Sequence, residues 1–384
     1  MRDGMRPGSE WIILRDKDVE ASIRALEQAG YRCLRSGRCG DTFDYSTLAS
    51  GHAVVYENLS LAVVNPPLGT ASWPKGEFVT QLDPSARTLA SVEATRGRSF
   101  TWGLVATRVH ESRFTGRGTR VCVLDRGIDG GHPDFAGREY ITRCFTGEGH
   151  THDDQGPGQG HGTHCAGTIV GPRVPFSGPR YGIAYDAELM VGKVIDQQGV
   201  ATDEATLAGI DWAVGEGCHV VSLSLGDRVW PGETHSPIFE WAANQALERG
   251  VLLIAPAGND SARGASALRP VQKPANCPSI MAVASLEKTL QVANSSNGGL
   301  EPAGGEIDIA APGVGVHSAL TGIQSLYSNL SGTSMAVPFV AGIALLHAEA
   351  EGARGRELRA LLQKSARSLE LPGSDVGAGL VQAP

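Results

Sequence analysis

Residues 121–129 read Val-Cys-Val-Leu-Asp-Arg-Gly-Ile-Asp, a short apolar run that ends on a carboxylate. This is the pattern of a buried strand with a polar group at its carboxyl end. Four similar runs follow at intervals that leave room for helices: Leu189 to Val194, Val220 to Leu223, Val251 to Ala255 and Ile280 to Ala284. The alternation predicts a three-layer α/β/α domain with a mainly parallel sheet.

Helix-length segments separate these strands. We expect helices near 161–170, 202–216, 238–249, 334–349 and 356–368. In open α/β sheets, reactive groups gather at the carboxyl ends of the strands. Reactive side chains are therefore expected directly after the strands, and Asp125 is the first of them.

Two Gly-rich segments supply a base and a nucleophile. The segment Gly-His-Gly-Thr-His-Cys-Ala-Gly contains His161, and the segment Ser-Gly-Thr-Ser-Met-Ala-Val-Pro contains Ser334. A serine hydroxyl becomes nucleophilic when an imidazole accepts its proton, and a carboxylate fixes the tautomer of that imidazole. Asp125, His161 and Ser334 together therefore predict an acyl-transfer site. His161 and His164 could instead form a metal pair, but no third ligand follows at a known spacing.

Two groups are suited to stabilising an oxyanion. Ser334 is expected to open a helix, because Pro338 lies near the first turn, where a missing N–H is tolerated. The backbone N–H and the helix dipole at that position favour negative charge. Asn259, which follows the strand at 251–255, offers a side-chain amide as the second donor.

These segments resemble the subtilisin family of serine peptidases, whose triad also follows the order Asp, His, Ser. The resemblance covers about residues 100–382 and closes on Gly-Ala-Gly-Leu-Val at 377–381. It implies that Asn259 is the oxyanion-hole amide. Cys165, four residues after His161, is the variant of proteinase-K-like members and is expected to be a buried small side chain.

The resemblance also implies a set of substrate-binding residues. Ser224, Leu225 and Gly226 match one wall of the S1 pocket, which holds the side chain before the scissile bond, and Gly258 lies on the opposite wall. Gly199, Val200 and Ala201 fall near the edge strand, so they are expected to pair with an extended peptide.

Two residues depart from the family pattern. Arg126 follows the triad aspartate where the family usually has Ser or Thr, and we expect its side chain to point to solvent. Val337 stands where many members have Thr, which implies a change of packing.

A structural calcium site is a further implication of the resemblance. Asp308 and the carbonyls of Pro278 and Ile280 match a cation site of related enzymes, and oxygen ligands suit calcium. The alternative is a loop aspartate that caps its own turn. No cofactor is expected for the chemistry itself.

Residues 8–97 predict a separate small α+β domain, ferredoxin-like in its strand order, ahead of the peptidase domain at 98–384. Strands are expected at 9–15, 31–35, 52–56, 61–65 and 88–92, with a helix at 18–29 and irregular structure at 69–87. The domain resembles the propeptides that chaperone and inhibit subtilisin-like enzymes. We expect its last stretch, about Ser91 to Arg98, to enter the substrate cleft and to be cut between Ala94 and Ser99. A permanent accessory domain that binds a partner is the alternative.

Composition excludes several classes of protein. The 384 residues carry a net charge of −8, which argues against nucleic-acid binding. Seven cysteines without a CxxC pair favour free thiols. No apolar run has the length of a signal-peptide core or of a membrane span, so cytoplasmic location or non-classical export is expected.

The sequence therefore predicts a serine endopeptidase that acts on extended peptides, with its own N-terminal domain as an intramolecular inhibitor. A dedicated maturation protease for one partner or precursor is an alternative within the same class. A catalytically silent binding module is the alternative from another class.

Overall fold

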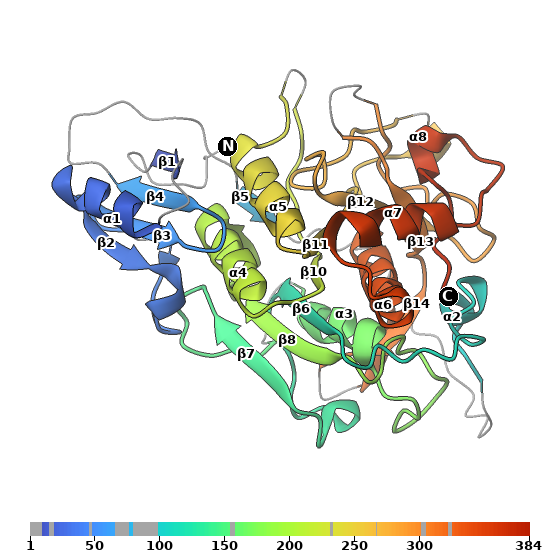
Figure 1. Ribbon diagram of the computed structural model, residues 1–384. Helices are drawn as coiled ribbons and strands as arrows, with labels where there is room; N and C mark the ends of the chain where they lie inside the picture. Colours follow the sequence, from blue (N-terminus) through green and yellow to red (C-terminus); the bar gives the residue numbers. More distant parts are fainter. Residues whose placement is uncertain are drawn as a thin grey trace.

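The computed structural model describes residues 10–14, 19–45, 48–65, 77–79, 99–153, 158–230, 233–265, 267–300, 305–321 and 325–384. A small N-terminal unit, blue in Figure 1, lies beside a larger α/β domain that contains the rest of the chain.

The larger domain is built on a parallel seven-stranded sheet, as predicted. Its order is β13-β12-β11-β10-β6-β8-β7, and every neighbouring pair is parallel. The strands are β6 (Arg120–Asp125), β7 (Tyr140–Cys144), β8 (Glu188–Lys193), β10 (Val220–Leu223), β11 (Leu252–Pro256), β12 (Met281–Leu286) and β13 (Ile309–Pro312). Asp125 ends β6, and later strands of the chain lie on both sides of β6 in the sheet. Ligands bind at such a position in open α/β sheets.

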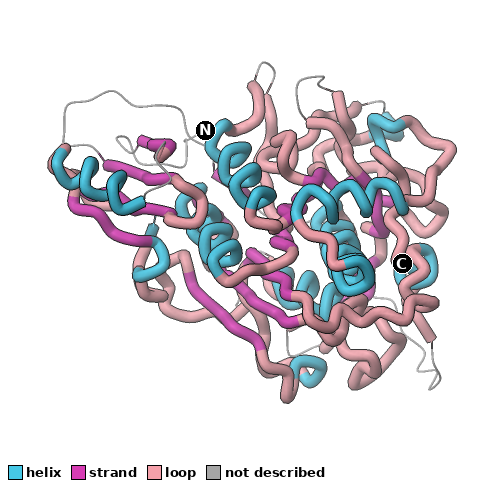
Figure 2. The backbone as a smooth tube through the Cα atoms, in the orientation of Figure 1, coloured by secondary structure: helices cyan, strands magenta, loops and turns pink. Residues whose placement is uncertain are grey.

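Helices cover both faces of this sheet, and Figure 2 shows the strands running between them. Cys122 and Leu124 of β6 pack into a core with α4 (Asp203–Gly215) and α5 (Pro237–Glu248). Val121 and Val123 point the other way, into a core with α3 (His161–Val170), α6 (Thr333–Glu351) and α7 (Gly355–Ser365). Because successive side chains of a strand point to opposite faces, the residues of β6 contact the two helical layers in turn.

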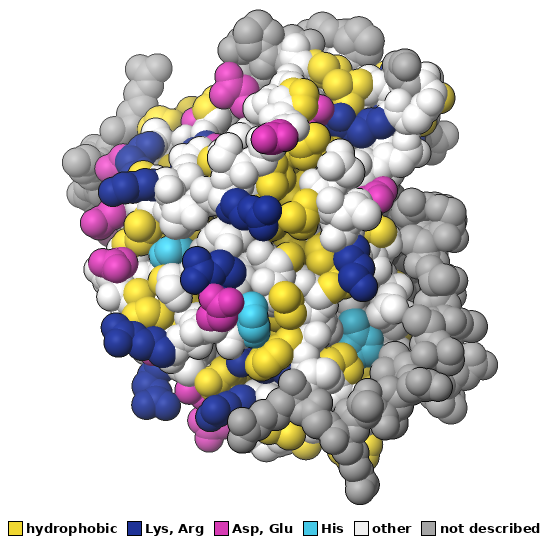
Figure 3. All heavy atoms as spheres, turned by 90° about the vertical axis from the view of Figure 1, so that its right-hand side faces the viewer, with side chains coloured by type: hydrophobic (Ala, Val, Ile, Leu, Met, Phe, Trp, Pro, Cys, Tyr) yellow, Lys and Arg dark blue, Asp and Glu magenta, His cyan; other side chains and the backbone are white. Residues whose placement is uncertain are grey.

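Shorter elements complete the domain. They are α2 (Trp102–Ala106), α8 (Gly373–Val376), the antiparallel pair β14 (Val316–Ala319) and β15 (Tyr327–Leu330), and 3-10 turns at Ser36–Arg38, Pro133–Phe135 and Arg263–Ala265. On the face seen in Figure 3, the described basic and acidic side chains are interspersed around a band of hydrophobic ones.

Contrary to the expectation that no segment has the length of a membrane span, helix α6 is long and apolar enough by length and composition, and it is the one such helix among the described residues. However, 89% of its apolar window is buried inside the protein, between the sheet and the neighbouring helices. The apolar character of α6 therefore reflects its place in the core.

The N-terminal unit is an α+β structure, as predicted. It contains β1 (Glu10–Ile13), α1 (Val19–Gln28), β2 (Arg32–Arg35), β3 (His52–Tyr56) and β4 (Leu61–Asn65), in the sheet order β1-β4-β3-β2. Strand β4 lies between β1 and β3 and is antiparallel to both, as in a split βαβ unit. Strand β2 is parallel to β3, which departs from the antiparallel sheet of a ferredoxin-like fold. The strand expected at 88–92 lies outside the described residues, so the complete ferredoxin-like order stays a prediction.

Residues of the N-terminal unit bond directly to α4. The Asp211 carboxylate accepts hydrogen bonds from the Ser36 hydroxyl and, at 2.6 Å, from the backbone N–H of Asn58. The Asn58 amide donates back to the Asp211 carbonyl, and the Tyr56 hydroxyl donates to the carbonyl of Glu204. Burial raises the pKa of Asp211 to about 6, because its carboxylate has little access to water.

A second link joins the two parts of the chain through backbone pairing. Strand β5 (Glu77–Val79) is antiparallel to β9 (Val200–Thr202), with Phe78 opposite Ala201 and Val79 opposite Val200. The expectation of irregular structure throughout 69–87 is therefore wrong for these three residues. The segment 91–98, which was expected to enter the cleft, lies outside the described residues.

Candidate active site

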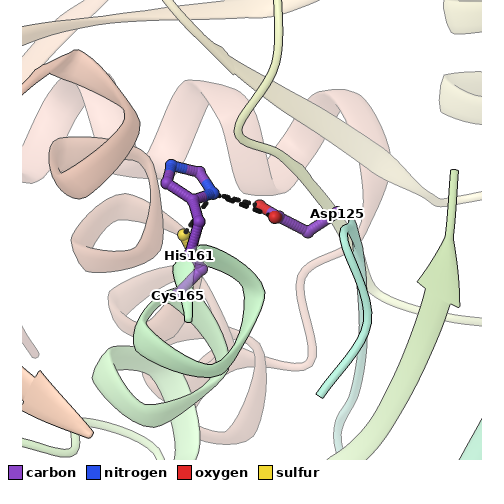
Figure 4. A group of neighbouring side chains, drawn as sticks. All are labelled: Asp125, His161 and Cys165. Atoms are coloured by element: carbon purple, nitrogen blue, oxygen red, sulfur yellow. Dashed lines mark hydrogen bonds and ion pairs between the residues drawn. The ribbon is translucent and has the colours of Figure 1, made fainter. Parts of the chain in front are cut away.

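Asp125 and His161 form a buried hydrogen-bonded pair. Asp125 is the last residue of β6, and His161 is the first residue of α3, which Gly160 precedes in a left-handed conformation (φ +83°). Nδ1 of His161 lies 2.9 Å from both carboxylate oxygens, and both side chains are almost fully buried. Figure 4 shows the imidazole edge-on to the carboxylate, with Nε2 on the far side of the ring.

Opposing effects act on the His161 imidazole. Burial on its own would lower the pKa, but the charge and hydrogen bond of Asp125, together with the neighbouring Cys165, outweigh it and raise the pKa well above 6.5. The carboxylate also fixes the neutral tautomer with the proton on Nδ1, which leaves Nε2 as the basic atom. Nε2 is buried and has no hydrogen-bond partner in the described structure.

Asp153 fixes the start of α3, a role that the sequence analysis missed. One of its oxygens accepts from the N–H of Gly160 at 3.1 Å, and the other accepts from the N–H and hydroxyl of Thr163, each at 2.7 Å. Burial raises the pKa of Asp153 to about 6. An acid shortly before a helix start was the available signal, because such residues satisfy unpaired N–H groups.

Ser334 is the second residue of α6, which packs against α3. The sulfur of Cys165 on α3 lies 3.8 Å from the Ser334 carbonyl and 4.0 Å from Nδ1 of His161, which places the serine and the histidine around the same side chain. Its carbonyl accepts a hydrogen bond from the Ser224 hydroxyl at 3.0 Å, which ties the helix start to the segment after β10. Ser334 and His161 are not hydrogen-bonded to each other, and such contacts often tighten only when substrate binds.

Asn259 is held by the residue that precedes Ser334. Its side-chain oxygen accepts from the backbone N–H of Thr333 at 2.8 Å and from the Thr333 hydroxyl at 3.1 Å. The amide nitrogen lies 3.3 Å from the place that a Cβ at Gly332 would take, and Gly332 has φ +144°. A side chain at 332 would therefore crowd the Asn259 amide.

The predicted substrate-binding residues lie on three neighbouring segments. Ser224, Leu225 and Gly226 follow β10, Gly258 follows β11 with φ +110°, and Gly199 leads into β9. Between the β10 and β11 segments lies Gln272, which the sequence analysis did not identify. A Cβ at Gly226 would come within 2.1 Å of its amide nitrogen, and one at Gly258 within 2.9 Å of its amide oxygen.

Cys165 lies beneath the Asp125–His161 pair, as Figure 4 shows, with its sulfur 4.0 Å from Nδ1 of His161. The ligand atoms of these three residues lie within 4.8 Å of one another. Burial raises the pKa of the Cys165 thiol, so the metal-binding and nucleophilic thiolate is disfavoured. The structure thus agrees with a buried small side chain. All seven cysteines are described, and none is in a disulfide.

Arg126 was expected to point to solvent, and this is wrong. Its side chain is fully buried, and one terminal nitrogen is 3.4 Å from the carbonyl of Gln197, in the connection between β8 and β9. Its backbone N–H donates to Asp125 at 2.8 Å. The main chain therefore supplies a hydrogen bond to the carboxylate, and the guanidinium is enclosed because the β8–β9 connection folds over it.

The residues of the predicted calcium site do not fit a calcium ion. The guanidinium of Arg359 in α7 donates to the Pro278 carbonyl at 2.6 Å and to the Asp308 carboxylate at 2.7 Å. Gln363 and the N–H of Ala282 also donate to Asp308. An arginine thus supplies positive charge between two of the three predicted ligands, Pro278 and Asp308, and Ile280 remains without a demonstrated ligand role.

Comparisons with known proteins agree with this geometry. The model of the subtilase family matches residues 116–380. A thermostable alkaline protease of Halalkalibacterium halodurans is 35% identical over 309 residues, 78% of this chain and 77% of that protein. Subtilisin Savinase of Lederbergia lenta is 36% identical over 74% of this chain and 98% of its own length. Subtilisin E of Bacillus subtilis is 35% identical over 63% of this chain and 58% of its own length. Because the family match spans well over half of the sequence and includes Asp125, His161 and Ser334, the chain belongs to the subtilase family.

Proposed function

We propose that this serine endopeptidase uses Ser334 as nucleophile, His161 as general base and Asp125 as the group that orients the imidazole. The observation that carries the assignment is the bond from Nδ1 of His161 to the buried Asp125 carboxylate at 2.9 Å. This bond leaves the buried Nε2 to accept a proton. The chemistry needs no cofactor.

The assigned roles give a complete acyl transfer. The Ser334 oxygen bonds to the peptide carbonyl carbon while its proton moves to Nε2 of His161. The carbonyl oxygen becomes an oxyanion, which the N–H at the start of α6 and the amide of Asn259 stabilise. The tetrahedral centre then expels the amine, which takes the proton from His161. Water repeats the sequence on the acyl-enzyme and releases the acid.

Labelling with a fluorophosphonate probe tests this proposal. We expect one covalent adduct on wild-type protein, located at Ser334, and none on Ser334→Ala or His161→Ala. Ser365→Ala, on α7, is the matched control and should be labelled like wild type. Failure of wild type to react would contradict the proposal and favour a silent binding module.

We further propose that the N-terminal unit is an intramolecular inhibitor that the enzyme removes itself. Support comes from the pairing of β5 with β9, because an extended substrate would use the same edge strand. High effective concentration makes even a weak contact of this kind inhibitory.

The direction of β5 supports a cut soon after it. Val79, the last residue of β5, lies opposite Val200, the first residue of β9. The chain just before β9 donates to the carbonyl of Asp125, through the N–H groups of Val194 and Ile195. Strand β5 therefore runs toward the end of β9 whose preceding connection is bonded to the catalytic aspartate. We infer that the scissile bond follows Val79 closely, earlier than the interval 94–99 that the sequence suggested.

Intact-mass analysis of wild type beside Ser334→Ala tests this. We expect Ser334→Ala at full length and wild type shortened, with a new N-terminus shortly after residue 79. A new N-terminus between 94 and 99 would support self-processing but contradict the position inferred from β5. A wild-type chain that is active at full length would support the permanent accessory domain.

A further inference from the structure

We propose that Gln272 forms the floor of the S1 pocket and selects a carboxamide side chain, Gln or Asn, before the scissile bond. The inference rests on the proposed function and adds the substrate class to it. Its basis is the position of the buried Gln272 amide between two segments. One follows β10 and is bonded to Ser334, and the other follows β11 and contains Asn259.

The Gln272 side chain fills the space between these segments. The positions that a Cβ would take at Gly226 and Gly258 lie within 2.1 Å and 2.9 Å of the Gln272 amide. A side chain at either glycine would displace the Gln272 amide, and at Gly258 also the Asn297 amide, whose nitrogen lies 2.3 Å from that Cβ position. The N–H of Gln272 donates to the carbonyl of Ala257 at 2.9 Å, which anchors its backbone. The amide thus occupies the space between the segments after β10 and β11.

The amide oxygen of Gln272 lacks a hydrogen-bond partner. The residue is only 4% exposed, and the oxygen is buried without a donor in the described structure. Buried polar groups normally have partners, and the exceptions call for an explanation such as a ligand. A donor on the substrate side chain would satisfy this oxygen, whereas an apolar side chain would leave it unpaired.

Four charged side chains described near these segments are paired with each other: Asp260 accepts from Arg228 at 2.7 Å, and Glu233 pairs with Lys273 at 3.0 Å. The Asp227 carboxylate, next to Gly226, accepts from the backbone N–H of Arg228 at 2.7 Å. A carboxamide both donates and accepts without net charge, so it complements the Gln272 amide in either orientation of that group.

The chain's own sequence supplies such a residue. Thr80 and Gln81 follow β5 directly in the sequence. Gln81 is therefore the first carboxamide after the segment that occupies the edge strand. A pocket selective for glutamine would direct self-processing to the bond after Gln81.

Coumarin-amide substrates of sequence Phe-Val-Thr-X test the proposal on the protein as expressed, with X as Gln, Met, Leu, Lys or Glu. Gln and Met have nearly the same length and volume, so their ratio isolates the hydrogen bond. We expect kcat/KM for Gln to exceed that for Met by about tenfold or more, since a site built to hydrogen-bond a substrate group rejects analogues that lack it. Equal values, or a preference for Leu, Lys or Glu, would overturn the proposal.

Two variants show whether Gln272 is responsible. Gln272→Met keeps the volume and should remove the preference for Gln over Met, without a gain for Leu. Gln272→Ala should open the pocket and shift the preference toward Leu. A preference for Gln that survives in Gln272→Met would overturn the assignment. Fluorophosphonate labelling of Ser334 in every variant distinguishes failure of the selectivity proposal from failure of the proposed function. Only the proposed function would be contradicted by a wild-type protein that is not labelled.

Discussion

Nδ1 of His161 lies at the same distance, 2.9 Å, from both carboxylate oxygens of Asp125. Asp125 therefore stabilises the imidazolium, which raises the pKa of His161 well above 6.5. Because the general base must be neutral, kcat/KM should rise with pH and reach half of its maximum above pH 6.5.

A pH profile of Asp125→Asn checks this prediction. Removing the charge should shift the midpoint of kcat/KM to lower pH and reduce the maximum by about 10⁴, because the tautomer is no longer fixed. A midpoint that stays in place would show that another group titrates.

Asn259→Ala should lower kcat by about 10²–10³, which is the loss known for the corresponding amide of subtilisin itself. The expected KM is nearly unchanged, since the amide acts on charge that develops in the transition state. Steady-state kinetics with one peptide substrate measure both constants. Full kcat in this variant would contradict the role of Asn259 in the oxyanion hole.

Arg359→Met should destabilise the protein by about 3 kcal/mol, because it leaves the buried Asp308 carboxylate without its counter-charge. Thermal unfolding of wild type, Arg359→Met and Asp308→Asn provides the measurement. The Tm of Asp308→Asn should respond to millimolar calcium or to chelator by the same amount as that of wild type. A calcium response of wild type that disappears in Asp308→Asn would restore the metal site at Asp308.

The docking of the N-terminal unit should weaken as pH rises. The pKa of Asp211 is about 6 when the carboxylate is buried against Ser36 and Asn58, compared with 3.8 for an ordinary aspartate. The docked state thus binds the proton more tightly, so this contribution is complete below pH 3.8 and is lost as pH rises through 6. Two pKa units correspond to about 3 kcal/mol.

Limited proteolysis of the N-terminal unit in full-length Ser334→Ala, followed from pH 4 to pH 8, tests that dependence. The rate of cleavage should increase as pH rises from 4 to 8, and in Asp211→Asn this rate should depend little on pH. Glu188→Gln, an exposed acid on β8, is the matched control and should behave like Ser334→Ala alone. A flat profile with Asp211 intact would show that its protonation is not linked to docking.

The sequence predicted the features that rest on local pattern. The helix at 161–170 and the strands at 52–56 and 61–65 have the bounds expected, because apolar periodicity and turn residues mark them clearly. Strand β5 was missed because three residues carry little periodicity, and its partner lies more than a hundred residues away.

Long-range side-chain contacts limited the prediction of the site. Nothing in the sequence near Asp308 indicated Arg359, which reaches it from another helix. Arg126 was misjudged because its burial depends on the later connection between β8 and β9. Gln272 belongs to no motif, and its place between two glycines appears only when three segments meet.

The pairing of β5 with β9 has a consequence for the kinetics of maturation. Both strands belong to one polypeptide, so under the proposed self-processing the scissile bond and Ser334 meet at a frequency set by the connecting chain. The first cut should therefore be first order in protein, with a half-life that does not change on dilution. Cutting between molecules would begin only when a released active chain finds another copy, and it would appear as a second phase that accelerates with concentration.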